Sequence, residues 1–187
     1  MWCEGESIFA EAGASGKSVL DCALKNSLSG AEFLSTTPAT AGGAVFMNAG
    51  CFGSDTADIR KRMWATDGEN EIEFKREDLE FGYRKSPFQT NGLIVTKAEF
   101  GLTKCNEGFI INLSKELMVI KRCNPAVGIF PSAGSVFKRT QGGYAGQLID
   151  IAGLKGLQVG AAHKYHQNTP ALSSTKPMQP QPMSLRS

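Results

Sequence analysis

The sequence predicts an α+β fold, because segments with helical and strand-like periodicity follow one another without a regular rhythm. Residues 18–27 and 144–152 carry apolar side chains at helical spacing. Residues 93–102 instead place apolar side chains at every second position, as a strand does. Since the strict strand–helix–strand alternation of a parallel sheet is missing, we expect mixed helices and strands around a shared core.

The first predicted helix covers residues 18–27. Val19, Leu20 and Ala23 fall on one side of it, which is typical of a helix that packs on a core. The next segment, residues 36–53, is dominated by Gly, Ala and Thr. Because glycine weakens helices, we expect no regular helix there, and a backbone that can closely approach another backbone or a ligand.

A hairpin is predicted in the middle of the chain. Two strand-like segments, residues 61–65 and 71–74, flank Asp67-Gly68, a pair that favours a tight turn. The acidic run between Glu69 and Glu80 is interpreted as the solvated face of this hairpin. Residues 113–121 predict a further helix.

Charge and cysteine content exclude several classes of function. The 187 residues include 20 basic and 18 acidic ones, so no bulk positive charge favours nucleic acid or membrane binding. No run approaches the roughly 20 apolar residues of a membrane helix, and the start lacks the features of a secretory signal. The five cysteines are widely spaced without a Cys-x-x-Cys pair, which argues against a metal site and favours a reducing cytoplasm.

Residues 163–187 differ in composition from the rest. They hold four of the eight prolines, both histidines and no acidic residue. Residues 1–162 therefore contain 17 basic and 18 acidic residues and no candidate for a catalytic histidine. By itself, the composition of residues 163–187 is typical of a disordered extension.

Residues 11–18, Glu-Ala-Gly-Ala-Ser-Gly-Lys-Ser, are similar to the end of a phosphate-binding P-loop. Glu11 stands where that motif has its first glycine, and its carboxylate would repel phosphate. We therefore interpret the segment as a loop that leads into the helix at Ser18. Nucleotide binding through Lys17 stays as an alternative.

Two other segments place cationic side chains beside small or aromatic residues, namely residues 81–86 and 131–139. Arg84 could bind a carboxylate or phosphate through two N–H groups, and Lys138 and Arg139 could hold similar anions. Plain surface loops would show the same residue pattern.

In their order along the chain, these segments resemble the UDP-N-acetylenolpyruvoylglucosamine reductases (MurB). The resemblance runs from about residue 8 to residue 160. The Gly-Tyr-Arg and Gly-Ser-Val-Phe-Lys-Arg forms are similar to the shorter, type II branch of that family. The segments that carry the resemblance are residues 28–34, 38–53, 81–86, 131–139 and 144–156.

The resemblance implies a fold and a reaction. Residues 1–104 would form the C-terminal part of an FAD-binding domain of the vanillyl-alcohol-oxidase type, residues 105–162 a partial substrate-binding domain, and residues 163–187 a divergent tail. FAD and NADPH would be the cofactors and a UDP-sugar the substrate. The reaction would be the reduction of UDP-N-acetylenolpyruvoylglucosamine to UDP-N-acetylmuramate, a cytoplasmic step of peptidoglycan synthesis that involves no metal, nucleic acid or membrane.

The resemblance also assigns roles to single residues. Arg84 would stabilise the enolate that forms on the substrate, and Ser135 would give a proton to C2. The UDP-sugar would be held by Tyr83, Lys138 and Arg139. The flavin would lie against Gly42, Gly43, Asn48, Ala49 and Gly50.

Two departures from the family pattern predict inactivity. The family has a further flavin-domain segment before the position of Met1, and continues beyond residue 160 to a catalytic glutamate. We therefore expect this chain to lack stable FAD and turnover, unless a second polypeptide supplies those segments. Since a permitted back-translation of residues 162–180 encodes a family-like continuation in a shifted frame, we expect the tail to be out of frame. The alternative is a gene remnant without function.

Overall fold

The computed structural model describes residues 1–122, 132–134, 137–138, 144–159, 162–163 and 173–174. The chain divides into two compact units, Met1–Val119 and Ile120–Ser187, which are treated separately below. The domain bounds expected from the sequence stay predictions.

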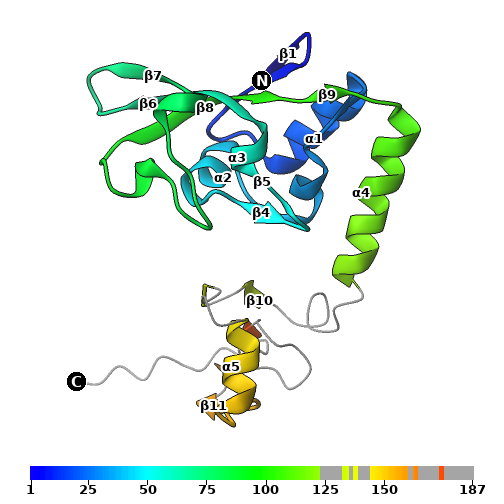
Figure 1. The fold of residues 1–187 in the computed structure, drawn as a ribbon, viewed down its shortest axis with the longest axis vertical. Coiled ribbons are helices and arrows are strands. Elements are labelled where there is room, and N and C mark those ends of the chain that lie inside the picture. The colour runs from blue at the N-terminus through cyan, green and yellow to red at the C-terminus, as the bar shows by residue number, and fades with distance from the viewer. Residues whose placement is uncertain (123–131, 135–136, 139–143, 160–161, 164–172, 175–187) are drawn as a thin grey trace, which may run out of the picture. The chain divides into compact units, whose positions relative to one another are not determined.

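The first unit is built on a five-stranded antiparallel sheet (Figure 1). The central strand β8 pairs with β2 on one side and with β6 on the other. The predicted strand over residues 93–102 and the predicted hairpin are thereby confirmed. In spatial order the strands are β1 (Trp2–Glu4), β2 (Ser7–Glu11), β8 (Ile94–Gly101), β6 (Arg60–Thr66) and β7 (Glu71–Lys75).

The β6–β7 turn is closed by the Asp67 side chain. Its Oδ1 accepts hydrogen bonds from the backbone N–H groups of Glu69, at 2.9 Å, and Asn70, at 2.8 Å. Gly68 follows with a φ of 106°, a conformation that glycine adopts without steric cost. The two donated hydrogen bonds favour the charged carboxylate and lower the pKa of Asp67.

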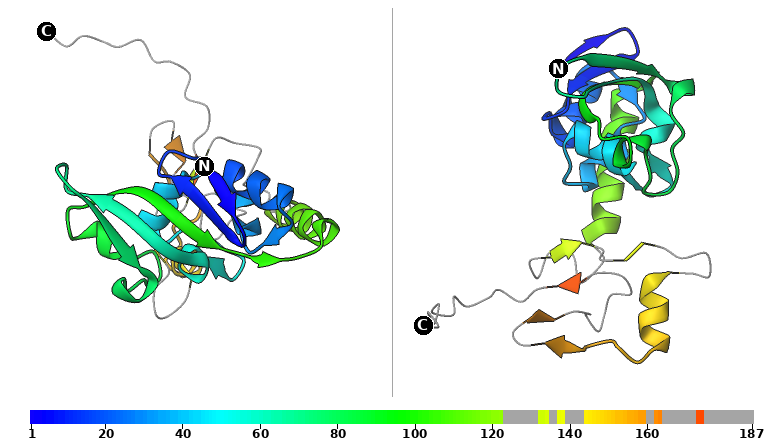
Figure 2. Two further views of the ribbon diagram at one scale, coloured as in Figure 1. Left: turned by 90° about the horizontal axis from the view of Figure 1, so that it is seen from above. Right: turned by 90° about the vertical axis from the view of Figure 1, so that its left-hand side faces the viewer.

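Three helices cover one face of this sheet, as Figures 1 and 2 show from different sides. The predicted first helix is confirmed as α1 (Gly16–Lys25), which buries Val19, Leu20 and Ala23. Its N-terminus is capped by Ser15 Oγ, which accepts from Ser18 N at 3.0 Å. The other two are α2 (Ala41–Met47) and α3 (Thr56–Ile59).

The core of this unit lies between the sheet and the helices. Ile8 and Phe100 from the sheet belong to one buried cluster with Val19 and Val45 from the helices. The connections between these elements are short. They are β3 (Leu28–Ser29), η1 (Glu32–Thr36), β4 (Gly50–Cys51), β5 (Ser54–Asp55), η2 (Arg76–Asp78), η3 (Pro87–Gln89) and β9 (Thr103–Lys104).

The expectation that residues 36–53 form no regular helix is wrong, because α2 lies within them. Contacts with a distant loop compensate for the low helix propensity of its glycines. The N–H groups of Ala41 and Gly42 donate to the carbonyls of Ala14, at 2.7 Å, and Ala12, at 2.9 Å. Thr40 Oγ1 accepts from Gly43 N at 3.2 Å and caps the helix.

The opposite face of the sheet carries aromatic and charged side chains. Phe9 stacks on Trp2 with ring centroids 4.9 Å apart, and Trp64 lies 6.3 Å from Phe9. Lys97 Nζ lies 4.1 Å from the centroid of the Trp64 ring. Long cationic side chains thus cover aromatic rings on this face.

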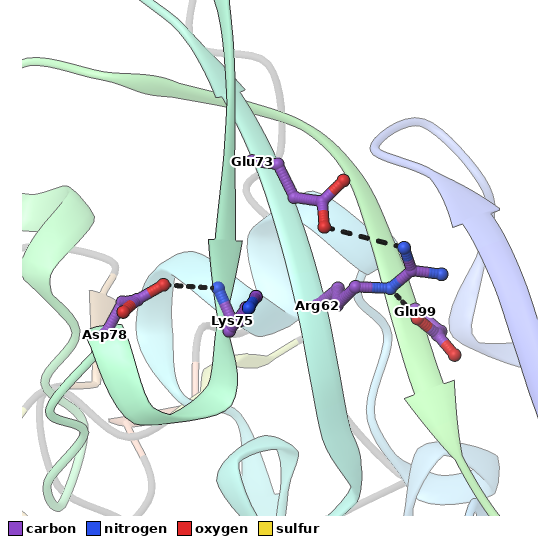
Figure 3. Close-up of polar contacts among 5 residues, drawn as sticks. All are labelled: Arg62, Glu73, Lys75, Asp78 and Glu99. Carbon is purple, nitrogen blue, oxygen red and sulfur yellow. Dashed lines mark hydrogen bonds and ion pairs between the residues drawn. The ribbon is translucent and has the colours of Figure 1, made fainter.

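Ion pairs connect the strands on the β7 side of the sheet (Figure 3). Arg62 on β6 binds Glu99 on β8 and lies 3.5 Å from Glu73 on β7. The hydrogen bond to Glu99 raises the pKa of Arg62. Where β7 ends, Asp78 accepts from Lys75 N at 2.7 Å. One carboxylate of the acidic run, Glu73, is therefore paired with a cation on the other strand of the same hairpin.

The last long helix of the described residues is α4 (Glu107–Arg122), which contains the predicted helix over residues 113–121. In the second unit, α5 (Ala145–Ile151) confirms the helix predicted over residues 144–152. No helix among the described residues is long and apolar enough to cross a membrane. The short strands here pair as β10 (Ser132–Gly134) with β13 (Ser173–Ser174), and β11 (Gln158–Val159) with β12 (Ala162–His163).

Candidate functional site

The most elaborate polar arrangement in the first unit surrounds Arg84, which lies in a tight turn. The N–H and C=O groups of Gly82 and Lys85 exchange two hydrogen bonds of 3.0 Å. Between them, Arg84 has a φ of 53°, which is uncommon for a residue with a side chain. The surroundings must therefore hold this turn in place.

The Arg84 guanidinium binds the chain just beyond α2. Its Nη1 donates to the Asn48 carbonyl at 3.1 Å, and its Nη2 donates to the Gly50 carbonyl at 2.7 Å. These two hydrogen bonds to backbone carbonyls fix the orientation of the guanidinium. The guanidinium carbon also lies 5.4 Å from the centroid of the Tyr83 ring, and Tyr83 is 55% exposed.

Asn48 connects three segments at this point. It ends α2 in the left-handed conformation, with a φ of 43°, and is 2% exposed. Its Nδ2 donates to the Gly82 carbonyl at 2.9 Å and to Asp55 Oδ2 at 3.1 Å. Its Oδ1 accepts from Ala57 N at 2.9 Å. The side-chain amide thus joins the end of α2 to α3 and to the Arg84 turn.

The residues after Asn48 are packed against β5 and α3. A Cβ at Gly50 would lie 2.5 Å from Asp55 Cβ and 2.8 Å from the Ser54 carbonyl oxygen, so only glycine fits without a shift. The neighbouring Ala49 is buried, and its carbonyl accepts from Thr56 Oγ1 at 2.9 Å. Gly50 can therefore offer its carbonyl to Arg84 from a fixed backbone.

Sequence reasoning assigned no role to two side chains that also brace the turn. Ser86 Oγ donates to the Phe46 carbonyl at 2.7 Å, and Gln89 Nε2 donates to the same carbonyl at 2.9 Å. Gln89 Nε2 lies 3.2 Å from the Arg84 carbonyl as well. Ser86-Pro87 is a common helix start, so the short helix η3 could have been predicted, but its contact with α2 could not.

Arg60 fixes the segment that enters the turn. It donates to the Ala57 carbonyl at 2.5 Å and to the Leu79 carbonyl at 3.1 Å, and its guanidinium carbon lies 4.5 Å from the centroid of the Phe81 ring. Burial, followed by the charge of Arg76, lowers the pKa of Arg60.

A cavity of about 340 Å³ lies beside the glycines of α2. Its walls are mostly apolar side chains and glycine backbone, which suit an apolar group better than a charged one. Gly42 and Gly43, both predicted to lie against a flavin, are among the lining residues. The full lining comprises Ala12, Thr40, Gly42, Gly43, Phe46, Leu93, Ile94 and Val95.

The other predicted residues belong to other parts of the chain. Lys138 is exposed in the second unit, whereas Ser135 and Arg139 lie outside the described residues. Lys17 of the P-loop-like segment forms an exposed ion pair with Asp21 at 2.7 Å. The described site thus brings together Asn48, Ala49, Gly50, Tyr83 and Arg84.

Comparison with known proteins finds a matching family model and relatives that share most of this chain. A family model described as "UDP-N-acetylenolpyruvoylglucosamine reductase, C-terminal domain" matches residues 125–177. The UDP-N-acetylenolpyruvoylglucosamine reductase of Pseudothermotoga lettingae is 42% identical over 160 residues, which are 85% of this chain and 56% of that protein. The protein of the same name from Streptococcus pneumoniae is 41% identical over 158 residues, or 84% of this chain and 52% of that protein.

A solved structure agrees with these sequence relatives. The crystal structure of UDP-N-acetylenolpyruvylglucosamine reductase (MurB) from Thermus caldophilus has a TM-score of 0.77 and 32% identity. The match covers 92% of this chain and 63% of that one. The chain therefore has a MurB-like fold of mixed helices and sheets.

These matches confirm the resemblance inferred from the sequence: the chain is homologous to the UDP-N-acetylenolpyruvoylglucosamine reductases over most of its length. It spans slightly more than half the length of the curated relatives described above. The family-model match includes residues 163–177, and the expectation of an out-of-frame tail stays a prediction.

Proposed function

We propose that this chain carries the part of a UDP-N-acetylenolpyruvoylglucosamine reductase that lies against the flavin and stabilises the charge developing on the substrate. Such an enzyme is an NADPH- and FAD-dependent oxidoreductase of peptidoglycan synthesis. The observation that supports it most is the Arg84 guanidinium, which uncharged carbonyls hold at the end of the glycine-rich segment 38–53. In this proposal the first unit is the C-terminal part of an FAD-binding domain of the vanillyl-alcohol-oxidase type. Part of the substrate domain follows it.

When bound, FAD reduced by NADPH would supply the hydride that adds to C3 of the enolpyruvyl group. The residues of this chain would then manage the negative charge that develops on the substrate. A cation that is already fixed stabilises such a charge more in the transition state than in the ground state, without reorganisation. Arg84 meets that requirement, because two backbone carbonyls fix its orientation.

The other assignments follow from the same resemblance. Ser135 would give the proton to C2, and Tyr83, Lys138 and Arg139 would hold the UDP-sugar. Gly42 and Gly43 border the apolar cavity and would place their backbone against the flavin. Residues 48–50, Asn-Ala-Gly, would place their backbone on the flavin side of Arg84.

The test is a comparison of two arginines that both donate to backbone carbonyls. Arg76 Nη1 donates to the Asp58 carbonyl at 3.1 Å and lies 3.4 Å from the Arg60 carbonyl, so it provides a matched control for Arg84. FAD binding is followed by fluorescence titration. NADPH oxidation is followed with the enolpyruvyl sugar nucleotide as substrate.

In a preparation that binds FAD and turns over, either the chain alone or the chain completed by a second polypeptide, we expect Arg84→Ala to lower kcat at least 100-fold with the Kd for FAD unchanged. Arg76→Ala should alter kcat less than twofold. Turnover of Arg84→Ala at the unchanged rate would contradict the role of Arg84. A chain that neither binds FAD nor oxidises NADPH would contradict the proposal for the chain alone. That outcome would confirm the inactivity predicted from the sequence.

A further inference from the structure

The buried side chain of Asn48 is held by three hydrogen bonds to other segments of the chain. Asn48 stands among the residues predicted to lie against the flavin, yet its side-chain amide is fully engaged by protein. Both Nδ2 protons are donated, to the Gly82 carbonyl and to Asp55 Oδ2, and Oδ1 accepts from Ala57 N. An amide has no further proton to donate.

The contact between Asn48 and the Arg84 turn runs in both directions. The Asn48 side chain donates to Gly82 in the turn, and Arg84 Nη1 donates back to the Asn48 carbonyl. These two bonds connect segments that are 34 and 36 residues apart in the sequence. With Asn48 itself 2% exposed, solvent cannot replace a lost partner easily.

From this geometry we infer that Asn48 is a positioning residue, whose side chain places the Arg84 guanidinium for catalysis. The inference rests on the proposed function of Arg84. Asparagine is suited to this place for two reasons. It tolerates the left-handed conformation that ends α2, and its amide supplies two donors and one acceptor.

Aspartate would keep the shape but not the chemistry. It would set an acceptor oxygen against the Gly82 carbonyl and the Asp55 carboxylate, both of which are acceptors. Glycine would keep the left-handed backbone and remove the side chain. Asn48→Gly and Asn48→Asp therefore separate the role of the amide from the requirements of the backbone.

Asn26 provides the matched control. It is the residue that ends α1, and its Nδ2 donates to the Cys22 carbonyl at 2.8 Å. Asn26→Gly removes one side-chain hydrogen bond at the end of a different helix, at a residue whose φ is −106°, without touching the Arg84 turn.

The first measurement is site-resolved amide hydrogen exchange in the full chain, which requires neither flavin nor turnover. We expect Asn48→Gly and Asn48→Asp to accelerate exchange at Gly82 and Lys85 about 10- to 100-fold, the effect of a lost buried hydrogen bond. Exchange along β8 should stay within threefold, and Asn26→Gly should leave the turn unchanged. Unchanged protection at Gly82 and Lys85, or equal acceleration along β8, would overturn the inference.

The second measurement separates positioning from flavin binding. In Asn48→Gly, the oxidation of reduced flavin by the enolpyruvyl substrate should slow about 10-fold or more. The Kd for FAD and the rate of flavin reduction by NADPH should stay within threefold. A weakened FAD affinity with an unchanged oxidation rate would overturn the inference and place Asn48 in the cofactor site. Should the proposed function itself fail, hydrogen exchange still decides the positioning of the turn.

Discussion

The close contact between α2 and the loop after β2 predicts unequal effects for two adjacent alanine substitutions. A Cβ added at Gly42 would lie 2.7 Å from Ala12 Cβ and 3.2 Å from Ala12 Cα, distances that force a shift of the backbone. A Cβ added at Gly43 would meet only the Thr40 hydroxyl oxygen, at 3.2 Å. Both positions lie inside the same helix.

The magnitudes follow from two opposing terms. Replacing glycine by alanine within a helix stabilises by about 1 kcal/mol at either position. Overpacking at Gly42 costs about 1–3 kcal/mol, because the Cβ, Cα and carbonyl oxygen of Ala12 cannot move away without a shift of its backbone. We therefore expect Gly42→Ala to be less stable than Gly43→Ala by about 1–3 kcal/mol in the free energy of unfolding.

The assay is urea unfolding followed by tryptophan fluorescence. Both tryptophans of the chain, Trp2 and Trp64, lie in the first unit, so their signal reports on that unit alone. The comparison of two variants cancels the shared helix-propensity term. A Gly42→Ala protein as stable as Gly43→Ala, or more so, would refute the reasoning that this contact requires glycine.

Two further predictions concern the same unit. Asp67→Ala should destabilise the β6–β7 hairpin near neutral pH. The difference in stability from the unaltered chain should vanish as pH falls below the ordinary carboxyl pKa of 3.8, because the pKa of Asp67 is lowered only in the folded state. Thermal unfolding between pH 7 and 2.5 measures this difference, and a difference that does not depend on pH would contradict the prediction. Phe88→Ala should lower the free energy of unfolding in urea by about 3–5 kcal/mol, since Phe88 is 2% exposed. Phe109 is 56% exposed, so Phe109→Ala should change it by less than about 0.5 kcal/mol. Equal effects of the two substitutions would contradict the assigned core.

Elements with a local cause were predictable from the sequence alone. The β6–β7 hairpin formed where Asp67-Gly68 supplies a turn, and α1 formed where apolar residues recur at helical spacing. The strand β8 followed from alternating side chains. Motif order was equally informative, because the resemblance to UDP-N-acetylenolpyruvoylglucosamine reductases rested on residues alone and was confirmed.

Elements whose cause lies far away in the chain were decided only by the tertiary structure. α2 contains two glycines and was expected to be irregular, yet carbonyls of residues 12 and 14 accept its first N–H groups and make it a helix. The sequence likewise pointed to Arg84 without showing what holds it. The donors and acceptors of Asn48 and Arg84 meet across more than 30 residues, and no local pattern encodes a pairing that depends on how distant backbones pack.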